Sequence, residues 1–190
     1  MVSGLETGFL LDRRWHRMTS GDERSKRPAL LELARVLAEA GVRWAVIGGV
    51  ALQVHRVEPR TTLDLDLAVD DRGKLPREAL AAAGFRETGR FEHSDNWEAP
   101  DGTPVQITDD PALGPAVARA GEVELEGVRI PVIGRADLLH EKLRAAADPG
   151  RRRSKRLQDL ADAQGLLEDD PALEGDLSRD ERSFLRTPRV

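Results

Sequence analysis

The segment that most constrains the fold spans residues 45–69, AVIGGVALQVHRVEPRTTLDLDLAV. Residues 43–47 are rich in β-forming side chains and stop at Gly48 and Gly49, which predicts a strand that ends in a glycine turn. The aliphatic residues 50–57 suit a buried helix, which the proline at position 59 ends. Residues 63–69 alternate apolar and acidic side chains, which predicts a second strand, antiparallel or adjacent to the first.

The second strand places two acids on one face. Because strand side chains alternate, Leu63, Leu65 and Leu67 are expected to face the core. Asp64 and Asp66 then share the opposite face, where two like charges repel one another. A Mg²⁺ ion held by carboxylates and substrate phosphates is the usual way to offset this repulsion. The alternative is an exposed strand face with incidental acids.

The glycine pair favours the first interpretation. Gly48 and Gly49 let the backbone approach a ligand closely, and the N–H groups at the start of the next helix, near Val50 and Ala51, can receive phosphate oxygens. An ordinary tight turn is the alternative for the glycines alone. Their spacing to the two aspartates is what makes a phosphate and metal site the stronger hypothesis.

The rest of the chain predicts an α+β fold with one mixed sheet flanked by helices and with helices at the C-terminal end. Residues 1–26 are polar and aperiodic, which predicts a loosely ordered N-terminal arm. Residues 27–168 form the predicted domain. Residues 169–190 are acidic and polar, which predicts a weakly ordered tail. Within the domain we expect further helices at 28–41, 74–83, 135–147 and 152–168, and strands at 85–88, 91–98, 104–108, 123–125 and 128–132.

Composition narrows the chemistry. The chain has no cysteine, so any metal must be held by oxygen or imidazole. No apolar stretch is long enough to cross a bilayer and no secretory signal is evident, so we expect a cytoplasmic protein without membrane contact. The net charge of −5 argues against a wholly basic surface, but one basic strip stands out. It consists of Arg151, Arg152, Arg153, Lys155 and Arg156, and its alternative interpretation is a solvated surface.

The segment GGVALQVHRVEPRTTLDLDLAV resembles the nucleotidyltransferase (polymerase-β-like) superfamily, whose mark is a GG or GS turn at a helix start followed by a strand with two alternating aspartates. Within it, the spacing of Arg60, Thr62, Asp64 and Asp66 is most similar to the AbiEii-type toxin nucleotidyltransferases and their small relatives. Downstream, ADLLHEKLRAA at 136–146 and the later Asp-x-x-Asp pattern resemble the lysine and aspartate helices of that family.

The resemblance implies transfer of a nucleoside monophosphate from an NTP to an acceptor hydroxyl with Mg²⁺. Asp64 and Asp66 would hold the metal, and Gly48 and Gly49 would cradle the phosphates. Arg60 would neutralise phosphate charge, although a surface arginine is an equally good interpretation.

Two helices are expected to add to the site. Lys142 follows Leu138 and Leu139 on a predicted apolar stripe, so it needs an anion such as a triphosphate or must snorkel to solvent. Asp159 and Asp162 are expected on a solvated helix face. The resemblance nevertheless implies that Asp159 is functional.

One departure from the family pattern concerns catalysis. Many active members carry a third carboxylate on a later strand, where this chain has Gln106. An amide cannot act as a base. Displaced acids are available in sequence at Asp95, Glu98, Asp109 and Asp110, and the resemblance offers Lys142 and Asp159 in their stead. The four histidines show no metal-binding spacing, and Trp44 and Trp97 are expected in the core, with a substrate pocket as the alternative for Trp97.

The leading hypothesis is therefore a Mg²⁺-dependent nucleotidyltransferase with an RNA or tRNA end as acceptor, toxin-like, with the basic strip guiding the acceptor backbone and with a cognate antitoxin or toxin protein as a partner. A small hydroxylated molecule such as an antibiotic is the enzyme-class alternative. A catalytically weakened module that binds nucleotide or a partner protein is the alternative of another class, and Gln106 favours it.

Overall fold

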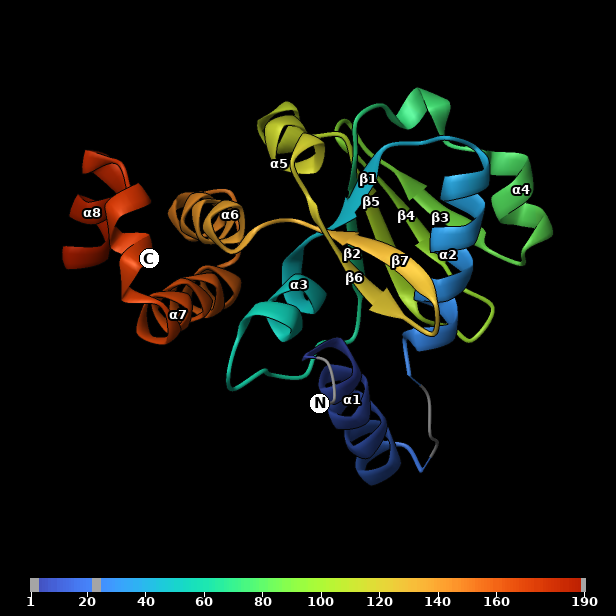
Figure 1. Cartoon of the computed structure of the whole chain (residues 1–190), viewed down its shortest axis with the longest axis horizontal. Helices are drawn as coiled ribbons and strands as arrows, with labels where there is room; N and C mark the ends of the chain where they lie inside the picture. Colours follow the sequence, from blue (N-terminus) through green and yellow to red (C-terminus); the bar gives the residue numbers. More distant parts are fainter. Residues whose placement is uncertain (1–3, 22–24, 189–190) are drawn as a thin grey trace.

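The computed structural model describes residues 4–21 and 25–188, in which seven strands form one mixed sheet (Figure 1). The strand order is β3-β4-β5-β2-β1-β7-β6. The strands are β1 (Trp44–Val46), β2 (Leu65–Val69), β3 (Arg86–Arg90), β4 (Ser94–Glu98), β5 (Pro104–Thr108), β6 (Gly121–Leu125) and β7 (Val128–Val132). β2 is antiparallel to β1 and parallel to β5, and β1 is parallel to β7. The predicted fold class is confirmed.

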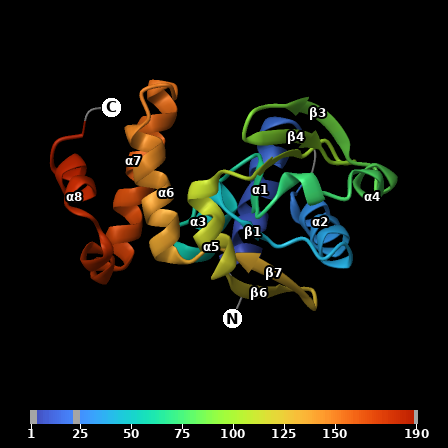
Figure 2. The same ribbon diagram turned by 90° about the horizontal axis from the view of Figure 1, so that it is seen from above.

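Helices cover both faces of this sheet. Figures 1 and 2 show α2 and α4 on one side and α3 and α5 on the other, with α6, α7 and α8 beyond α3. The α-helices are α1 (Gly4–Thr19), α2 (Arg27–Glu39), α3 (Gly48–His55), α4 (Arg77–Ala82), α5 (Gly114–Ala118), α6 (Arg135–Ala147), α7 (Arg153–Asp169) and α8 (Arg179–Arg186). Three 3-10 helices join them, η1 (Arg72–Lys74), η2 (Pro111–Leu113) and η3 (Pro171–Asp176).

The central strands are buried on both faces, which fixes the direction of their side chains. Leu65 and Leu67 of β2 are fully buried, as the alternation predicts. Leu63 is 54% exposed, so the prediction that it faces the core is wrong. The strand begins only at Leu65, and the preceding residues form a bend in which side chains need not alternate. Trp44 and Trp97 are both buried in the core, as expected.

The prediction of a loosely ordered N-terminal arm is wrong for residues 4–19. They form α1, which buries Leu5, Phe9 and Asp12 on one face. These positions are four and three residues apart and therefore share one stripe of the helix. An aspartate in the stripe hides this pattern from a hydrophobicity reading. The rest of the predicted arm includes residues 1–3 and 22–24, which lie outside the described residues.

The prediction of a weakly ordered tail is also wrong for most of its length. η3 buries Leu173, and Leu177 is buried just after it. Ser178 then caps α8 in a capping box with Glu181, in which each side chain bonds the backbone of the other residue. Two apolar anchors and one cap thus order a segment whose composition is mainly charged. Residues 189–190 of the predicted tail lie outside the described residues.

No helix in the described part of the chain has both the length and the apolar character needed to cross a membrane.

Candidate active site

The turn from β1 into α3 can be made only by glycine at its first position. Gly48 has φ of +61°, a left-handed conformation that side chains disfavour. A Cβ atom built on Gly48 would lie 2.3 Å from Oδ2 of Asp66. The missing side chain therefore makes room for an aspartate of the neighbouring strand. The glycine turn and the acidic strand, which the sequence treats as two motifs, form one packing unit.

The two predicted metal-binding carboxylates lie on the wall of one cavity of about 280 Å³. The Asp64 carboxylate accepts a hydrogen bond of 2.7 Å from the Thr62 hydroxyl. The Asp66 carboxylate accepts one from the backbone N–H of Gly49, at the first turn of α3. Asp64 and Asp66 thus line one cavity, although Asp64 lies in the bend before β2 and only Asp66 belongs to the strand.

The two carboxylates repel one another in a partly dehydrated site. Burial and the neighbouring charge of Asp64 raise the pKa of Asp66 to about 7, although the Lys142 ammonium counteracts part of this rise. Among the described residues, no three His, Asp or Glu side chains cluster as a complete metal-binding set. The two acids therefore suit a cation that takes its remaining ligands from a substrate and from water, as Mg²⁺ does with nucleotide phosphates.

Lys142 of α6 lines the same cavity. Its Nζ lies 2.9 Å from Oδ1 of Asp159 and 3.3 Å from Oδ2 of Asp162, and the side chain is buried. Burial disfavours the charged lysine, but the carboxylates of Glu141, Asp159 and Asp162 outweigh it and raise the pKa of Lys142. The lysine is therefore a fixed cation in the cavity, and the snorkelling alternative is wrong because its head is buried.

The sequence predicted that Asp159 and Asp162 lie on a solvated helix face, and this prediction is wrong. Both are buried, whereas Leu157 on the same helix is 45% exposed. α7 is turned this way because cations compensate its acids. Asp159 accepts a hydrogen bond of 2.8 Å from Nε of Arg151 in addition to the bond from Lys142. The charged pairs and the buried Leu160 together form the inner face of this part of α7.

Arg60 is held by the same helix. Its Nε and Nη2 donate to the two carboxylate oxygens of Asp162 at 2.9 and 2.8 Å. This fork geometry ties the loop before β2 to α7. Arg60 also lines the cavity. Arg60 is therefore paired with a protein carboxylate and lies at the cavity, so it is not an isolated surface arginine.

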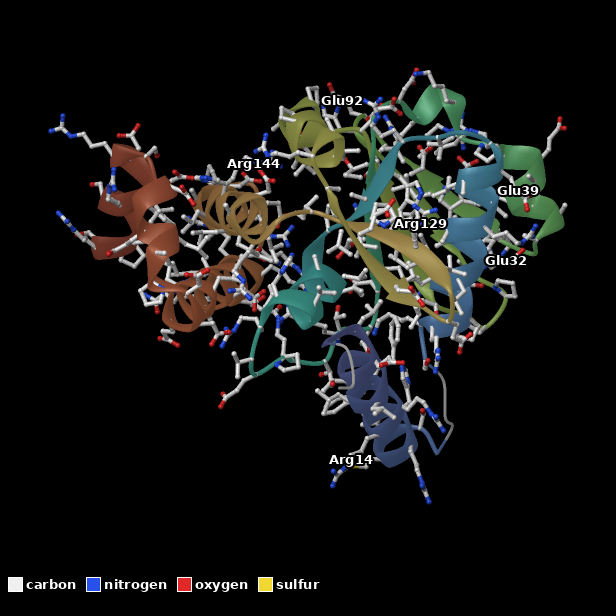
Figure 3. The ribbon with its side chains drawn as sticks, viewed as in Figure 1. Arg14, Glu32, Glu39, Glu92, Arg129 and Arg144 are labelled. Carbon is white, nitrogen blue, oxygen red and sulfur yellow. The ribbon has the colours of Figure 1, made fainter. Side chains whose placement is uncertain are left out.

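Gln106 occupies the strand position beside the acids. β5 is parallel to β2 with Gln106 opposite Asp66, and its side chain lines the same cavity. The displaced acids lie elsewhere, because arginines hold them. Asp95 pairs with Arg72 and Arg77, Glu98 with Arg86, Asp109 with Arg72, and Asp110 with Arg144. Figure 3 shows Arg144 on α6 beside α5. None of these four acids lines the cavity.

The basic strip is divided by the structure. Arg151, Arg152 and Lys155 line the cavity mouth. Arg153 and Arg156 are not among the lining residues, and the Nε of Arg156 donates to the carbonyl of Ala146. The strip is therefore partly a wall of the site and partly a helix start.

Sequence reasoning missed three residues near the site. Thr62 and Gln158 line the cavity, and Thr62 could have been found from its place in the spacing before Asp64. Glu141 carries a buried oxygen, Oε2, that has no hydrogen-bond partner among the described residues, and burial raises its pKa. A glutamate beside a lysine on a helix gives no sequence signal of this burial.

The sequence matches one known protein family. A family model described as "Nucleotidyl transferase AbiEii toxin, Type IV TA system" matches residues 30–187. No curated protein matches the sequence.

Solved structures share the fold at low identity. An antigenic nucleotidyltransferase-like protein from Paracoccidioides brasiliensis is 18% identical with a TM-score of 0.52, over 83% of this chain and 89% of that chain. ANT(2")-Ia in complex with adenylyl-2"-tobramycin is 15% identical with a TM-score of 0.55, over 87% and 99%. The Megavirus polyadenylate synthase is 15% identical with a TM-score of 0.56, over 84% and 34%. At these identities the likeness concerns the fold alone.

Proposed function

Because the chain belongs to the AbiEii nucleotidyl transferase toxin family, we propose that it transfers a nucleoside monophosphate from an NTP to an acceptor hydroxyl. The observation that carries the proposal is the composition of one cavity. Two carboxylates, Asp64 and Asp66, and a fixed ammonium, Lys142, line it beside the first turn of a helix. This arrangement offers opposite charges to the two parts of a metal-bound triphosphate.

Mg²⁺ is the proposed cofactor, and Asp64 and Asp66 would hold it. When bound, it neutralises the triphosphate and stabilises charge that develops on the transferring phosphoryl group. The fit rests on the chemistry of the donors, since both are carboxylates and the raised pKa of Asp66 reflects a charge that lacks compensation. We infer that a divalent cation relieves this repulsion.

The residues of the chain then have separate tasks. Lys142, which remains charged because of its raised pKa, binds phosphate oxygens. Asp159 orients the lysine, because it accepts its hydrogen bond at 2.9 Å. The N-terminal turn of α3, with Gly49 on the cavity wall, accommodates the phosphates.

The proposed reaction is a displacement at the α-phosphorus, in which one bond forms and one breaks. The acceptor oxygen bonds to the α-phosphorus, the bond from that phosphorus to the bridging oxygen breaks, and pyrophosphate leaves with the electron pair. The hydroxyl proton passes to solvent, because Gln106 has no basic atom and both oxygens of Asp159, the carboxylate that the resemblance offered in its stead, are bonded by Lys142 and Arg151. We therefore expect slow turnover.

An RNA or tRNA end is the proposed acceptor. Arg152 and Lys155 stand at the mouth of the cavity, where they would meet the phosphates of an acceptor strand. The fold shared with the Megavirus polyadenylate synthase supports this proposal. ANT(2")-Ia, which shares the fold, was solved in complex with adenylyl-2"-tobramycin, so a small hydroxylated acceptor is the alternative to test.

One observation favours a second candidate, a module that binds nucleotide or a cognate toxin or antitoxin protein without transfer. The amide of Gln106 beside Asp66 removes the base that would complete the site. This candidate predicts nucleotide binding and no labelled product.

The deciding experiment incubates the purified protein with Mg²⁺ and each of the four α-labelled NTPs, with total RNA, tRNA or an aminoglycoside as acceptor. Asp64→Asn and Asp66→Asn should abolish label transfer. Glu78→Gln, an exposed acid on α4, should retain it and serves as the matched control. Binding of NTP without transfer to any acceptor would favour the binding module, and absence of binding to any NTP or cognate protein would refute both candidates.

A further inference from the structure

Beneath the acidic site lies a buried ion pair that comes from the N-terminal part of the chain. Asp12 of α1 and Lys26, which precedes α2, are 1% and 3% exposed. The Lys26 ammonium donates to Oδ2 of Asp12. Both lie outside the residues 30–187 that match the family model. Burial of two charges costs desolvation free energy, so we looked for what this ion pair contributes to the structure.

Both members of the pair bind the backbone of one residue. The Thr62 N–H donates to Oδ1 of Asp12 at 3.2 Å, and the Thr62 carbonyl accepts from the Lys26 ammonium. Thr62 is therefore held through its own donor and its own acceptor. Its hydroxyl continues the chain of contacts, since it donates to Oδ1 of Asp64 at 2.7 Å.

A third side chain completes the network. Gln53 of α3 is fully buried and donates from Nε2 to Asp12 at 3.3 Å and to the Arg60 carbonyl at 3.0 Å. The loop that leads into β2 is thus bonded at residues 60 and 62. These bonds come from α1, α3 and the residue before α2, and all of them are directed at the segment that delivers the first aspartate.

α1 is close enough to α3 to make this network because it carries a glycine at the contact. A Cβ atom on Gly8 would lie 2.5 Å from Cδ of Gln53. Asp12, one turn further along the same face, then reaches the loop. The opposite face of α1 is solvated, and Arg14 points away from the sheet (Figure 3).

We propose that the buried Asp12–Lys26 pair positions Asp64, by fixing the Thr62 backbone from both sides. The importance of Asp64 rests on the proposed function. The statement that the pair holds the loop before Asp64 does not depend on that function. Neither Asp12 nor Lys26 lines the cavity, so both are positioning residues that act through Thr62. α1 then contributes to the site although it lies outside the matched family region.

The test uses the double variant Asp12→Leu with Lys26→Met, which removes both the acceptor and the donor that hold the Thr62 backbone. It leaves the net charge and approximate shape unchanged, and it avoids leaving one buried charge without its partner. Amide hydrogen exchange of peptides covering residues 57–64 reports the loop without any ligand. Mn²⁺ binding, followed by its electron paramagnetic resonance signal, reports the carboxylates without turnover.

We expect faster exchange over 57–64 and an Mn²⁺ affinity lowered about 10-fold, as for other residues that orient metal ligands. Thr62→Val should lower the affinity similarly, and Thr62→Ser should restore it. Asp95→Asn is the matched control, because it removes a fully buried carboxylate that is paired with Arg72 and Arg77 away from the cavity. It should lower the thermal midpoint without changing either readout.

Unchanged exchange in the double variant would overturn the proposal, and so would faster exchange with unchanged Mn²⁺ affinity. If the wild-type protein binds no Mn²⁺, the proposed function fails separately. The exchange measurement then still decides whether the pair holds the loop.

Discussion

Gln106 faces Asp66 in register on adjacent parallel strands, so an amide lies where the cavity would otherwise hold a third acid. The site keeps the two carboxylates that suit a metal and the lysine that suits a phosphate. Asp159, the other carboxylate in the cavity, is held by Lys142 and Arg151. We therefore expect position 106 to govern the rate of transfer, and it can be changed without disturbing the core because Gln106 is exposed.

Gln106→Glu should therefore increase nucleotidyl transfer. A positioned base contributes roughly 10²-fold or more to such reactions, so an increase of at least ~10-fold in kcat is the expected outcome. The added charge should also lower the thermal midpoint in metal-free buffer and enlarge the upward shift on adding Mg²⁺. Steady-state kinetics and thermal unfolding measure the two effects.

Gln106→Asn is the control for shape and should change neither quantity in that direction. Equal rates for Gln106→Glu and wild type, with an unchanged Mg²⁺ response, would show that position 106 does not face the reacting centre.

Gly48→Ala should damage the site more than the fold. The left-handed φ costs roughly 1–2 kcal/mol for a residue with a side chain. The new methyl group must also displace the Asp66 carboxylate, which lies 2.3 Å from the Cβ position. We expect a thermal midpoint lowered by a few degrees and label transfer reduced to background.

Gly175→Ala is a suitable control because no atom lies within 4 Å of its Cβ position. It should leave both the midpoint and label transfer near wild type. If Gly48→Ala binds Mn²⁺ with wild-type affinity, the packing of glycine against Asp66 is not needed for the site.

The sequence predicted the parts of the site that depend on neighbouring residues. The glycine turn, the two aspartates and the lysine belong to local patterns with a fixed period, and the structure brings Gly49, Asp64, Asp66 and Lys142 into one cavity. The same local patterns predict that the strands on either side of the glycine turn are antiparallel or adjacent, and β1 pairs with β2 in antiparallel orientation.

What could not be predicted depends on residues far apart in the chain. Asp159 and Asp162 are buried because Lys142 and Arg60 compensate them, and no local period shows such compensation. The same holds for Asp12, whose partner Lys26 lies 14 residues away and whose target Thr62 lies 50 residues away. In each case a charged residue is buried beside its counter-ion. The sequence alone predicts a surface position for it, because the counter-ion lies far away in the chain.

His55 should make stability depend on pH. Its Nε2 lies 2.7 Å from the Ile133 carbonyl, and burial lowers its pKa, with the Arg135 charge adding to this effect. The unfolded chain then binds a proton more readily than the folded one below about pH 6.5. Stability is therefore complete above this value and falls as the pH decreases, by at most about 1.4 kcal/mol per pH unit.

His55→Gln, whose amide can still donate to the carbonyl, should remove this loss. Urea unfolding between pH 5 and 7.5 measures it, with the exposed His93→Gln as control. Asp66, with its pKa raised to about 7, titrates in the same range with the opposite sign. It is present in both proteins, so the difference between them isolates His55. Parallel pH profiles for wild type and His55→Gln would rule out the histidine as the cause.

The cavity mouth should determine how salt affects binding of an RNA acceptor. Arg152 and Lys155 line the cavity, whereas Arg153, on the same short segment, does not. Each cation that contacts a single-stranded phosphate contributes about 0.7 to the slope of log affinity against log salt concentration. Replacing Arg152 and Lys155 by alanine should therefore weaken binding at low salt and reduce this slope by about 1.4. Arg153→Ala should leave the slope unchanged, and fluorescence anisotropy with a labelled RNA over 50–300 mM KCl measures both. Equal slopes for the three proteins would mean that the acceptor does not pass over this mouth, and a small hydroxylated acceptor would then become the better hypothesis.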